Sequence, residues 1–151
     1  MKLLPLLGLI CFSLMAQAQD TIPNSVLNSL KFRNVGPALT SGRIVDLATD
    51  PTDFNTYYVA AAYSGVWKTS NAGTTFKPIF DNYGTQSIGC LTIDPKDHLK
   101  VWVGTGENNN QRSVGYGNGV YLSLNGGKSF RNMGLKESQH IGMIKVHPDN
   151  S

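Results

Sequence analysis

The chain of 151 residues is poor in charge and shows no clustering of basic residues. Charged residues make up 15% of it and the formal net charge is +3, against about 25% charged residues in an average soluble domain. Its 13 Lys and Arg residues never stand three in a row, so the basic stripe of a nucleic-acid-binding protein is absent. Coiled coils and helical bundles are excluded too, because they need dense Glu, Lys, Leu and Ala.

Long hydrophobic runs are also missing, and the one apolar run, Leu3 to Met15, is interrupted. It is too short to span a bilayer, which takes about 20 residues. Lys2 precedes this run and Ala16-Gln17-Ala18 follows it, a pattern typical of a secretory signal peptide over residues 1–18. We therefore expect a protein secreted to the periplasm or the medium, with no membrane span after cleavage.

Cysteine is scarce as well, since the chain holds only Cys11 and Cys90. Loss of residues 1–18 would leave Cys90 alone, so no intramolecular disulfide can form. Cys90 stands between Gly89 and Leu91 in an apolar run. We expect it to be a buried, unreactive thiol.

What the sequence does have is glycine, proline and an internal repeat. Residues 65–76 match residues 119–130 at a constant offset of 54. Apolar segments at 44–50, 88–94 and 141–147 each end directly before a proline, and a further apolar segment follows each of the first two. In the segment 44–50, the side chains of Val45, Leu47 and Thr49 are expected to lie on one face of the strand. Four short strands in about 45–50 residues is the period of a propeller blade.

The sequence thus predicts an all-β fold, a β-propeller fragment of about two four-stranded blades plus the first strand of a third at 141–147. The expected domains are a signal peptide at 1–18, a lead-in at 19–33 and a partial propeller at 34–151. Because propellers close with about 4–8 blades, we expect an N-terminal fragment of a larger domain whose partners are its own downstream blades. Without them, four apolar side chains would be partly exposed: Leu91, Ile93, Trp102 and Tyr121.

The turn in the repeat has its own chemistry. An Asn side chain can cap the turn, a glycine supplies positive φ, and an aromatic ring returns between the strands. We expect these residues to be structural: Thr69, Asn71, Gly73, Thr75, Phe76, Ser123, Asn125, Gly127, Ser129 and Phe130. Both segments resemble Asp-boxes of the bacterial neuraminidase repeat, with Asn in place of Asp and Phe in place of Trp.

A wider set of short motifs follows in order along the chain. They are Phe32-Arg33-Asn34-Val35-Gly36-Pro37, Ser41-Gly42-Arg43-Ile44, Gly65-Val66-Trp67-Lys68-Thr69, Ser87-Ile88-Gly89, Gly104-Thr105-Gly106-Glu107-Asn108, Gln111-Arg112-Ser113-Val114 and His140-Ile141-Gly142. This pattern resembles the N-terminal propeller of exported bacterial proteins with sortilin/Vps10-type repeats, many of which are labelled glycosyl hydrolases. The resemblance implies a propeller of many blades in a much longer polypeptide.

The second repeat unit is ten residues longer than the first, and the excess lies between its second and third strands. In an up-and-down blade this insertion shares a face with the connectors that follow the fourth strands. The face would gather these candidate ligand-binding residues: Arg43, Gln86, Glu107, Asn108, Gln111, Arg112, Tyr116 and His140. A glycan or a peptide could bind there. Equally, the insertion could be a solvated loop that bonds its own backbone. Glu107 could then pair with Arg112 and stabilise the loop, and His140 could satisfy a carbonyl of its own connector.

Enzymatic residues are harder to find. Glycoside hydrolysis takes two carboxylates flanking the bond, and this face offers only Glu107 and Glu137, with Asp81 peripheral. The distantly similar xyloglucan-cleaving propellers carry a catalytic Asp where residues 61–65 have no carboxylate. His98, His140 and His147 lie in separate turns and connectors, so neither a metal nor another cofactor is expected.

The sequence therefore favours an exported propeller segment that is a binding scaffold for glycan or peptide ligands. The alternative is a glycoside hydrolase whose catalytic carboxylates lie partly or wholly in downstream blades. No catalytic residue is assigned.

Overall fold

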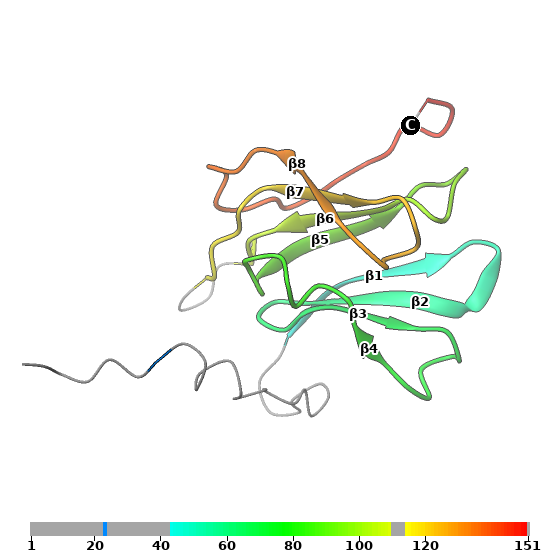
Figure 1. The fold of residues 1–151 in the computed structure, drawn as a ribbon. Coiled ribbons are helices and arrows are strands. Elements are labelled where there is room, and N and C mark those ends of the chain that lie inside the picture. Colours follow the sequence, from blue (N-terminus) through cyan, green and yellow to red (C-terminus); the bar gives the residue numbers. More distant parts are fainter. Residues whose placement is uncertain (1–22, 24–42, 110–113, 151) are drawn as a thin grey trace, which may run out of the picture. The chain divides into compact units, whose positions relative to one another are not determined.

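The structure is a computed structural model that describes residues 23, 43–109 and 114–150 (Figure 1). The chain divides into two units, Met1–Asn34 and Val35–Ser151, and every described strand belongs to the second. The predicted signal peptide at 1–18 lies outside the described residues. So does the predicted lead-in at 19–33, apart from Pro23.

Eight strands form two antiparallel sheets of four. The first sheet has β1 (Ile44–Asp50), β2 (Asp53–Ala61), β3 (Gly65–Thr69) and β4 (Lys77–Pro78), and the second has β5 (Ile88–Ile93), β6 (Val101–Thr105), β7 (Val120–Ser123) and β8 (Arg131–Gly134). Each sheet pairs its strands in chain order, and the described part of the chain holds no helix. This confirms the predicted all-β fold with two four-stranded propeller blades. We call them blade 1 and blade 2.

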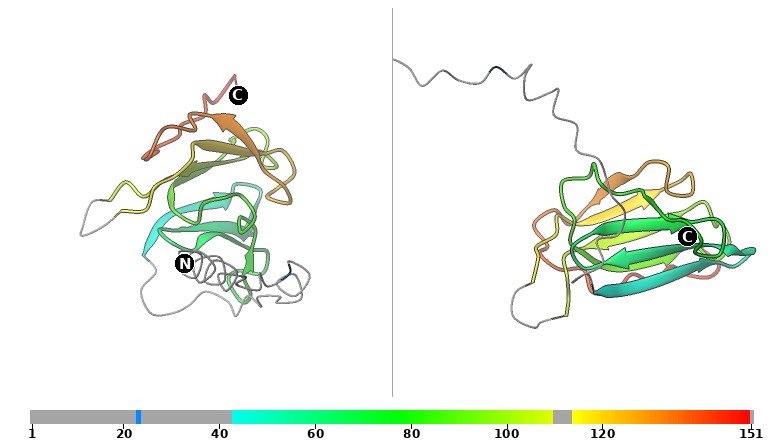
Figure 2. Two further views of the ribbon diagram at one scale, coloured as in Figure 1. Left: turned by 60° about the vertical axis from the view of Figure 1, so that its left-hand side comes forward. Right: turned by 90° about the horizontal axis from the view of Figure 1, so that it is seen from below.

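The inner strands of the two blades, β1 and β5, lie side by side, as Figures 1 and 2 show. One polar contact joins them, since the backbone N–H of Leu91 donates to Asp46 Oδ2 at 2.8 Å. Elsewhere the blades meet through the apolar side chains of a shared core and through polar contacts at the two ends of the strands. The blades are therefore two sheets packed on one core, not one continuous sheet.

A β-bulge corrects the predicted face of β1. Between Ile44 and Asp46 the register with β2 shifts by one residue, which reverses the alternation of side chains. As a result Val45 and Ala48 pack against the core, while Leu47 is 59% exposed. The prediction that Val45 and Leu47 share a face was wrong for this reason.

Phe80 is the centre of the core between the blades. It comes from the connector after β4 and is fully buried. Its ring centroid lies 4.9 Å from that of Tyr83, 5.1 Å from Tyr121 and 5.2 Å from Phe130. Blade 2 thus turns Tyr121 and Leu91 toward blade 1.

This packing contradicts part of the prediction that four apolar side chains of blade 2 would be partly exposed to solvent. Leu91 and Tyr121 are buried, whereas Ile93 and Trp102 are half-buried. The sequence shows which residues alternate along a strand, but not which face of the strand meets the neighbouring sheet. Leu91 and Tyr121 lie on the face that blade 1 covers, where Ile93, two residues after Leu91, also packs against the core.

Residues 141–147, predicted to be the first strand of a third blade, do not form a strand. They run beside blade 2, where Thr92 Oγ1 donates to the Ile144 carbonyl at 3.0 Å and the Ile141 N–H donates to the Thr105 carbonyl at 3.0 Å. A strand needs a ladder of backbone hydrogen bonds, and no described strand offers one to this segment. Its place beside β5 nevertheless repeats the place of β5 beside β1.

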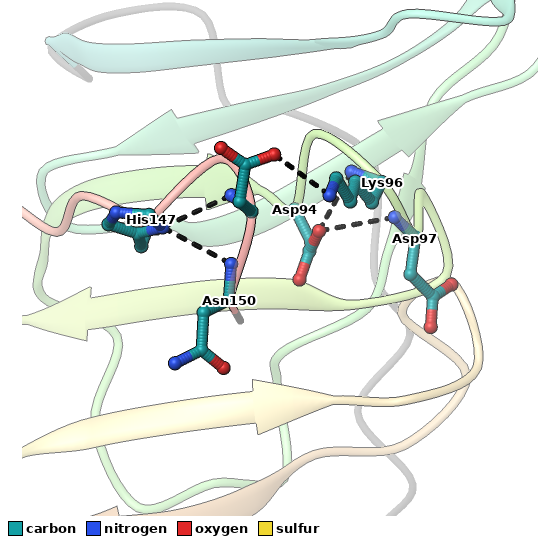
Figure 3. Close-up of polar contacts among 6 residues, drawn as sticks. Asp94, Lys96, Asp97, His147 and Asn150 are labelled. Atoms are coloured by element: carbon teal, nitrogen blue, oxygen red, sulfur yellow. Dashed lines mark hydrogen bonds and ion pairs between the residues drawn. The ribbon is translucent and has the colours of Figure 1, made fainter.

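The turns that carry the prolines are capped by the residue before each proline. The acceptors are Asp50, Asp94 and His147. His147 Nδ1 accepts from the N–H groups of Asp149 and Asn150 at 3.1 and 3.2 Å (Figure 3). Lys96 Nζ donates to Asp149 Oδ1 at 3.0 Å, which ties the last turn to that of blade 2. An imidazole nitrogen thus takes the place of an aspartate oxygen in this turn.

The turn between β3 and β4 is held by side-chain hydrogen bonds. Asn71 Oδ1 accepts from the Thr75 N–H at 2.9 Å, and its Nδ2 donates to Thr75 Oγ1 at 2.9 Å. Thr69 Oγ1 accepts from the N–H of Gly73 at 3.0 Å, and Gly73 has φ +86°. Phe76 then packs edge-on against Tyr57, with centroids 5.9 Å apart.

The turn between β7 and β8 repeats this network. Asn125 accepts from the Ser129 N–H at 2.9 Å and donates to Ser129 Oγ at 2.8 Å. Ser123 Oγ accepts from the N–H of Gly127 at 2.9 Å, and that glycine has φ +84°. Here the aromatic residue, Phe130, enters the core. The same local chemistry therefore builds both turns.

We predict that Asn125→Ala destabilises the protein by about 0.5–2 kcal/mol, the range for loss of a side-chain cap. Asn125→Asp is expected to cost less, because a carboxylate keeps the acceptor for the Ser129 N–H and lets the Ser129 hydroxyl donate instead. Urea unfolding of both variants checks this. Equal loss in the two variants would show that the cap is not what holds the turn.

Cys90 gives a second prediction. It is buried, and burial raises the pKa of its thiol to about 11. Because the folded protein disfavours the thiolate, any stability that the neutral thiol contributes is complete below pH 9 and is lost as the pH rises toward 11. At pH 8 iodoacetamide should alkylate Cys90 about 100-fold more slowly in the native protein than in urea. Similar rates in both states, measured by mass spectrometry, would contradict the buried thiol.

Candidate functional site

The loop between β6 and β7 carries the insertion of the second repeat unit, and its described part is fastened at both ends. The Gly106 N–H donates to the Ser87 carbonyl at 2.8 Å, and the Glu107 N–H donates to Ser87 Oγ at 3.0 Å. On the return, Ser87 Oγ donates to the Gly115 carbonyl at 2.8 Å, and the Gly117 N–H donates to the Gln139 carbonyl at 2.8 Å. The loop therefore bridges the connectors before β5 and before residue 141.

Two glycines allow this close approach. Gly106 has φ +87°, and a Cβ there would run into the Gln139 carbonyl. A Cβ on Gly117 would meet the backbone of Thr105 and of Gly106. Both ends of the loop are thus pressed against neighbouring backbone, and a side chain would push them apart.

Arg43 and Glu107 form an ion pair between the start of β1 and this loop. The Glu107 side chain is 1% exposed, while that of Arg43 is about one-third exposed. The guanidinium Nη2 also donates to the Asn109 carbonyl at 3.3 Å. The pair links blade 1 to blade 2. Arg112, the partner that the sequence suggested for Glu107, lies outside the described residues.

Tyr116 and His140 form a second pair, with ring centroids 5.5 Å apart in an edge-on arrangement. Tyr116 is 64% exposed. Its backbone carbonyl accepts from Thr85 Oγ1 at 3.1 Å, so the residue is held although its ring is open to solvent. The imidazole of His140 thus packs against the Tyr116 ring.

The side-chain amides of Asn108 and Gln86 each donate to a backbone carbonyl. Asn108 Nδ2 donates to the Gly142 carbonyl at 3.1 Å, and Gln86 Nε2 donates to the Asp81 carbonyl at 3.2 Å. Asn108 thus adds a further link between the loop and the segment 141–147, and Gln86 stabilises its own connector.

The structure brings six of the eight predicted residues to one end of the blades. They are Arg43, Gln86, Glu107, Asn108, Tyr116 and His140, and we call this set the rim. Gln111 and Arg112 lie outside the described residues.

Sequence reasoning missed the residues that hold the rim in place. Ser87 fastens both ends of the loop, and Thr105 Oγ1 donates to the Gly119 carbonyl at 2.6 Å while accepting from the Asn118 N–H at 2.8 Å. Asn118 Nδ2 in turn donates to the Tyr83 carbonyl at 3.3 Å. A signal was present, since Ser87 occupies the same repeat position as Arg43 and His140, directly before an Ile.

In the part of the chain that the structure describes, no three His, Cys, Asp or Glu side chains lie close enough together to hold a metal ion. Over the same residues no helix has the length and apolar character needed to cross a membrane.

We predict that Glu107→Gln lowers the free energy of unfolding by about 1–3 kcal/mol, because it removes the buried charge that Arg43 faces. Glu137→Gln is the matched control, since Glu137 is exposed on the connector after β8 and should change stability by less than about 0.5 kcal/mol. Chemical unfolding of the three proteins measures the difference. Equal midpoints for the two variants would mean that the ion pair contributes nothing to the rim.

Comparison with known proteins finds similar solved structures but no matching family model or curated protein. Among solved structures that are similar is the GH74 xyloglucanase from Xanthomonas campestris, with a TM-score of 0.44 and 17% identity. The match covers 57% of this chain and 14% of that enzyme. A likeness of this size assigns neither a family nor an activity.

Proposed function

We propose that this chain is part of an exported β-propeller whose rim binds carbohydrate. The observation that carries the proposal is Tyr116, whose ring is 64% exposed and packs edge-on against His140, and whose backbone carbonyl is held by the Thr85 hydroxyl. Export rests on the leader pattern at residues 1–18, and the propeller on the two blades.

An anchored, open aromatic ring suits a sugar. A pyranose has one face of C–H groups, which packs on the electron-rich face of an aromatic ring. Because the ring already packs against His140, binding would cost less side-chain entropy than for a ring without such a contact. Hydroxyl groups of the sugar would find a hydrogen-bonding partner beside the ring in the imidazole of His140.

The described carboxylates favour binding over hydrolysis. A glycosidase holds two carboxyl groups roughly 5–10 Å apart with the sugar bond between them. Glu107 is buried and paired with Arg43, so it is not presented to a substrate. Glu137 is exposed on a separate connector. Hydrolysis by this protein would need carboxylates beyond the residues described.

The test is retention of the full chain on immobilised neutral polysaccharides: a β-glucan, a xyloglucan, a mannan and an arabinan. We expect saturable binding to at least one of them and about tenfold weaker binding by Tyr116→Ala, which corresponds to about 1.4 kcal/mol. Phe54→Ala is the matched control, since Phe54 is 80% exposed at the far end of β2 and should leave binding unchanged.

Three results would count against the proposal. If no polysaccharide is retained, or if the two variants bind alike, the rim is not a carbohydrate site. If reducing ends are released from a retained polysaccharide, the protein is a hydrolase and the binding proposal is replaced by that alternative.

A further inference from the structure

A recess lies at the end of blade 1 away from the rim, among the turns that join the third and fourth strands of the two blades. It has a volume of about 270 Å³. Blade 1 contributes Lys68, Ser70, Thr75 and Lys77, and the turn of blade 2 contributes Gly127 and Lys128. We call it the lysine recess. Three ammonium groups from separate segments surround it, and no carboxylate lines it.

Lys68 is held in place on one wall of the recess. Its Nζ donates to the Gly126 carbonyl at 2.8 Å and lies 5.1 Å from the centroid of the Tyr58 ring. Burial lowers its pKa, the charge of Lys128 adds to that effect, and Asp50 opposes it. Lys68 and Lys128 therefore repel each other across the recess, which an anion between them would relieve.

The other groups of the recess can also serve an anion. Lys77 and Lys128 form no ion pair with any residue that the structure describes. Thr75 Oγ1 accepts a hydrogen bond from Asn71, which leaves its own hydroxyl proton to donate. Ser70 adds a second hydroxyl. The lining thus offers positive charge and hydrogen-bond donors together.

The internal repeat supplies a comparison within the same chain. Blade 2 has a recess of about 310 Å³ at the equivalent place, 54 residues further on. There Leu122 stands in place of Lys68 and Leu124 in place of Ser70, while Arg131 keeps the charge of Lys77. The fold therefore makes this recess in both blades but does not require lysine or serine to line it.

We propose that the lysine recess binds a tetrahedral oxyanion, a sulfate or a phosphate group, between Lys68, Lys77 and Lys128. Ammonium groups bind such anions as point charges, strengthened by charge-assisted hydrogen bonds. The site is independent of the carbohydrate site proposed for the rim, because the two lie at opposite ends of the strands.

The experiment is a titration of the ¹⁵N-labelled full chain with sodium sulfate, followed by the amide shifts of Gly126, Gly127 and Lys128. Sodium chloride at matched ionic strength is the reference, and glucose 6-sulfate and glucose 6-phosphate are titrated in parallel. We expect saturable shifts with sulfate but not with chloride. Tighter binding of either sugar ester than of the inorganic ion would identify an esterified ligand, and equal binding would identify the free ion.

Variants then separate binding from mere salt effects. Lys68→Leu copies the residue of blade 2, and Lys128→Gln changes an exposed side chain; each should weaken sulfate binding at least fivefold. Arg131→Gln, the matched control at the position equivalent to Lys77, should leave it unchanged. If Lys68→Leu fails to fold, Lys128→Gln still decides. Shifts that chloride reproduces, or that all three variants retain, would overturn the proposal.

Discussion

Burial of the Phe80 ring between the two sheets is the contact from which the rest of the structure follows. The residue belongs to neither sheet but to the connector between them, and Tyr121 and Phe130 of blade 2 close on it edge-on. Loss of a buried Phe side chain typically costs 3–5 kcal/mol, a large share of the stability of a domain of this size. Because the ring is shared, neither blade keeps its core without the other.

The connector that holds Phe80 also links this core to the rim. Tyr83, three residues after Phe80, accepts the Phe130 N–H on its hydroxyl at 3.0 Å and the Tyr121 hydroxyl on its carbonyl at 2.9 Å. That carbonyl also accepts from Asn118, which begins the return of the long loop to β7. A continuous path of packed rings and hydrogen bonds therefore joins the core to the loop that presents Tyr116, which is how an exposed ring comes to be held.

The two ends of the blades use the repeat in different ways. At the turn end, Asn71 and Asn125 make the same hydrogen bonds, and the chemistry varies only in the side chains that line each recess. At the rim end the units differ in length, and the insertion in the second unit builds a surface that the first lacks. The proposed sites lie where the repeats depart from each other, since positions common to both serve the fold.

Local chemistry was sufficient to predict the blades and their turns. An Asn cap and a glycine with positive φ act within a few positions of chain, so spacing alone could suggest them, and strand parity predicted a shared end for Arg43, Glu107, Tyr116 and His140. What spacing could not reveal depended on contacts between segments far apart. The bulge at Val45, the burial of Leu91 and Tyr121, and the choice of Arg43 as the partner of Glu107 were each decided by which surfaces of the two sheets meet. The lysine recess was missed for the same reason: its walls come from β3, β4 and a turn some 50 residues away, and only the packing of blade 2 against blade 1 brings their charges together.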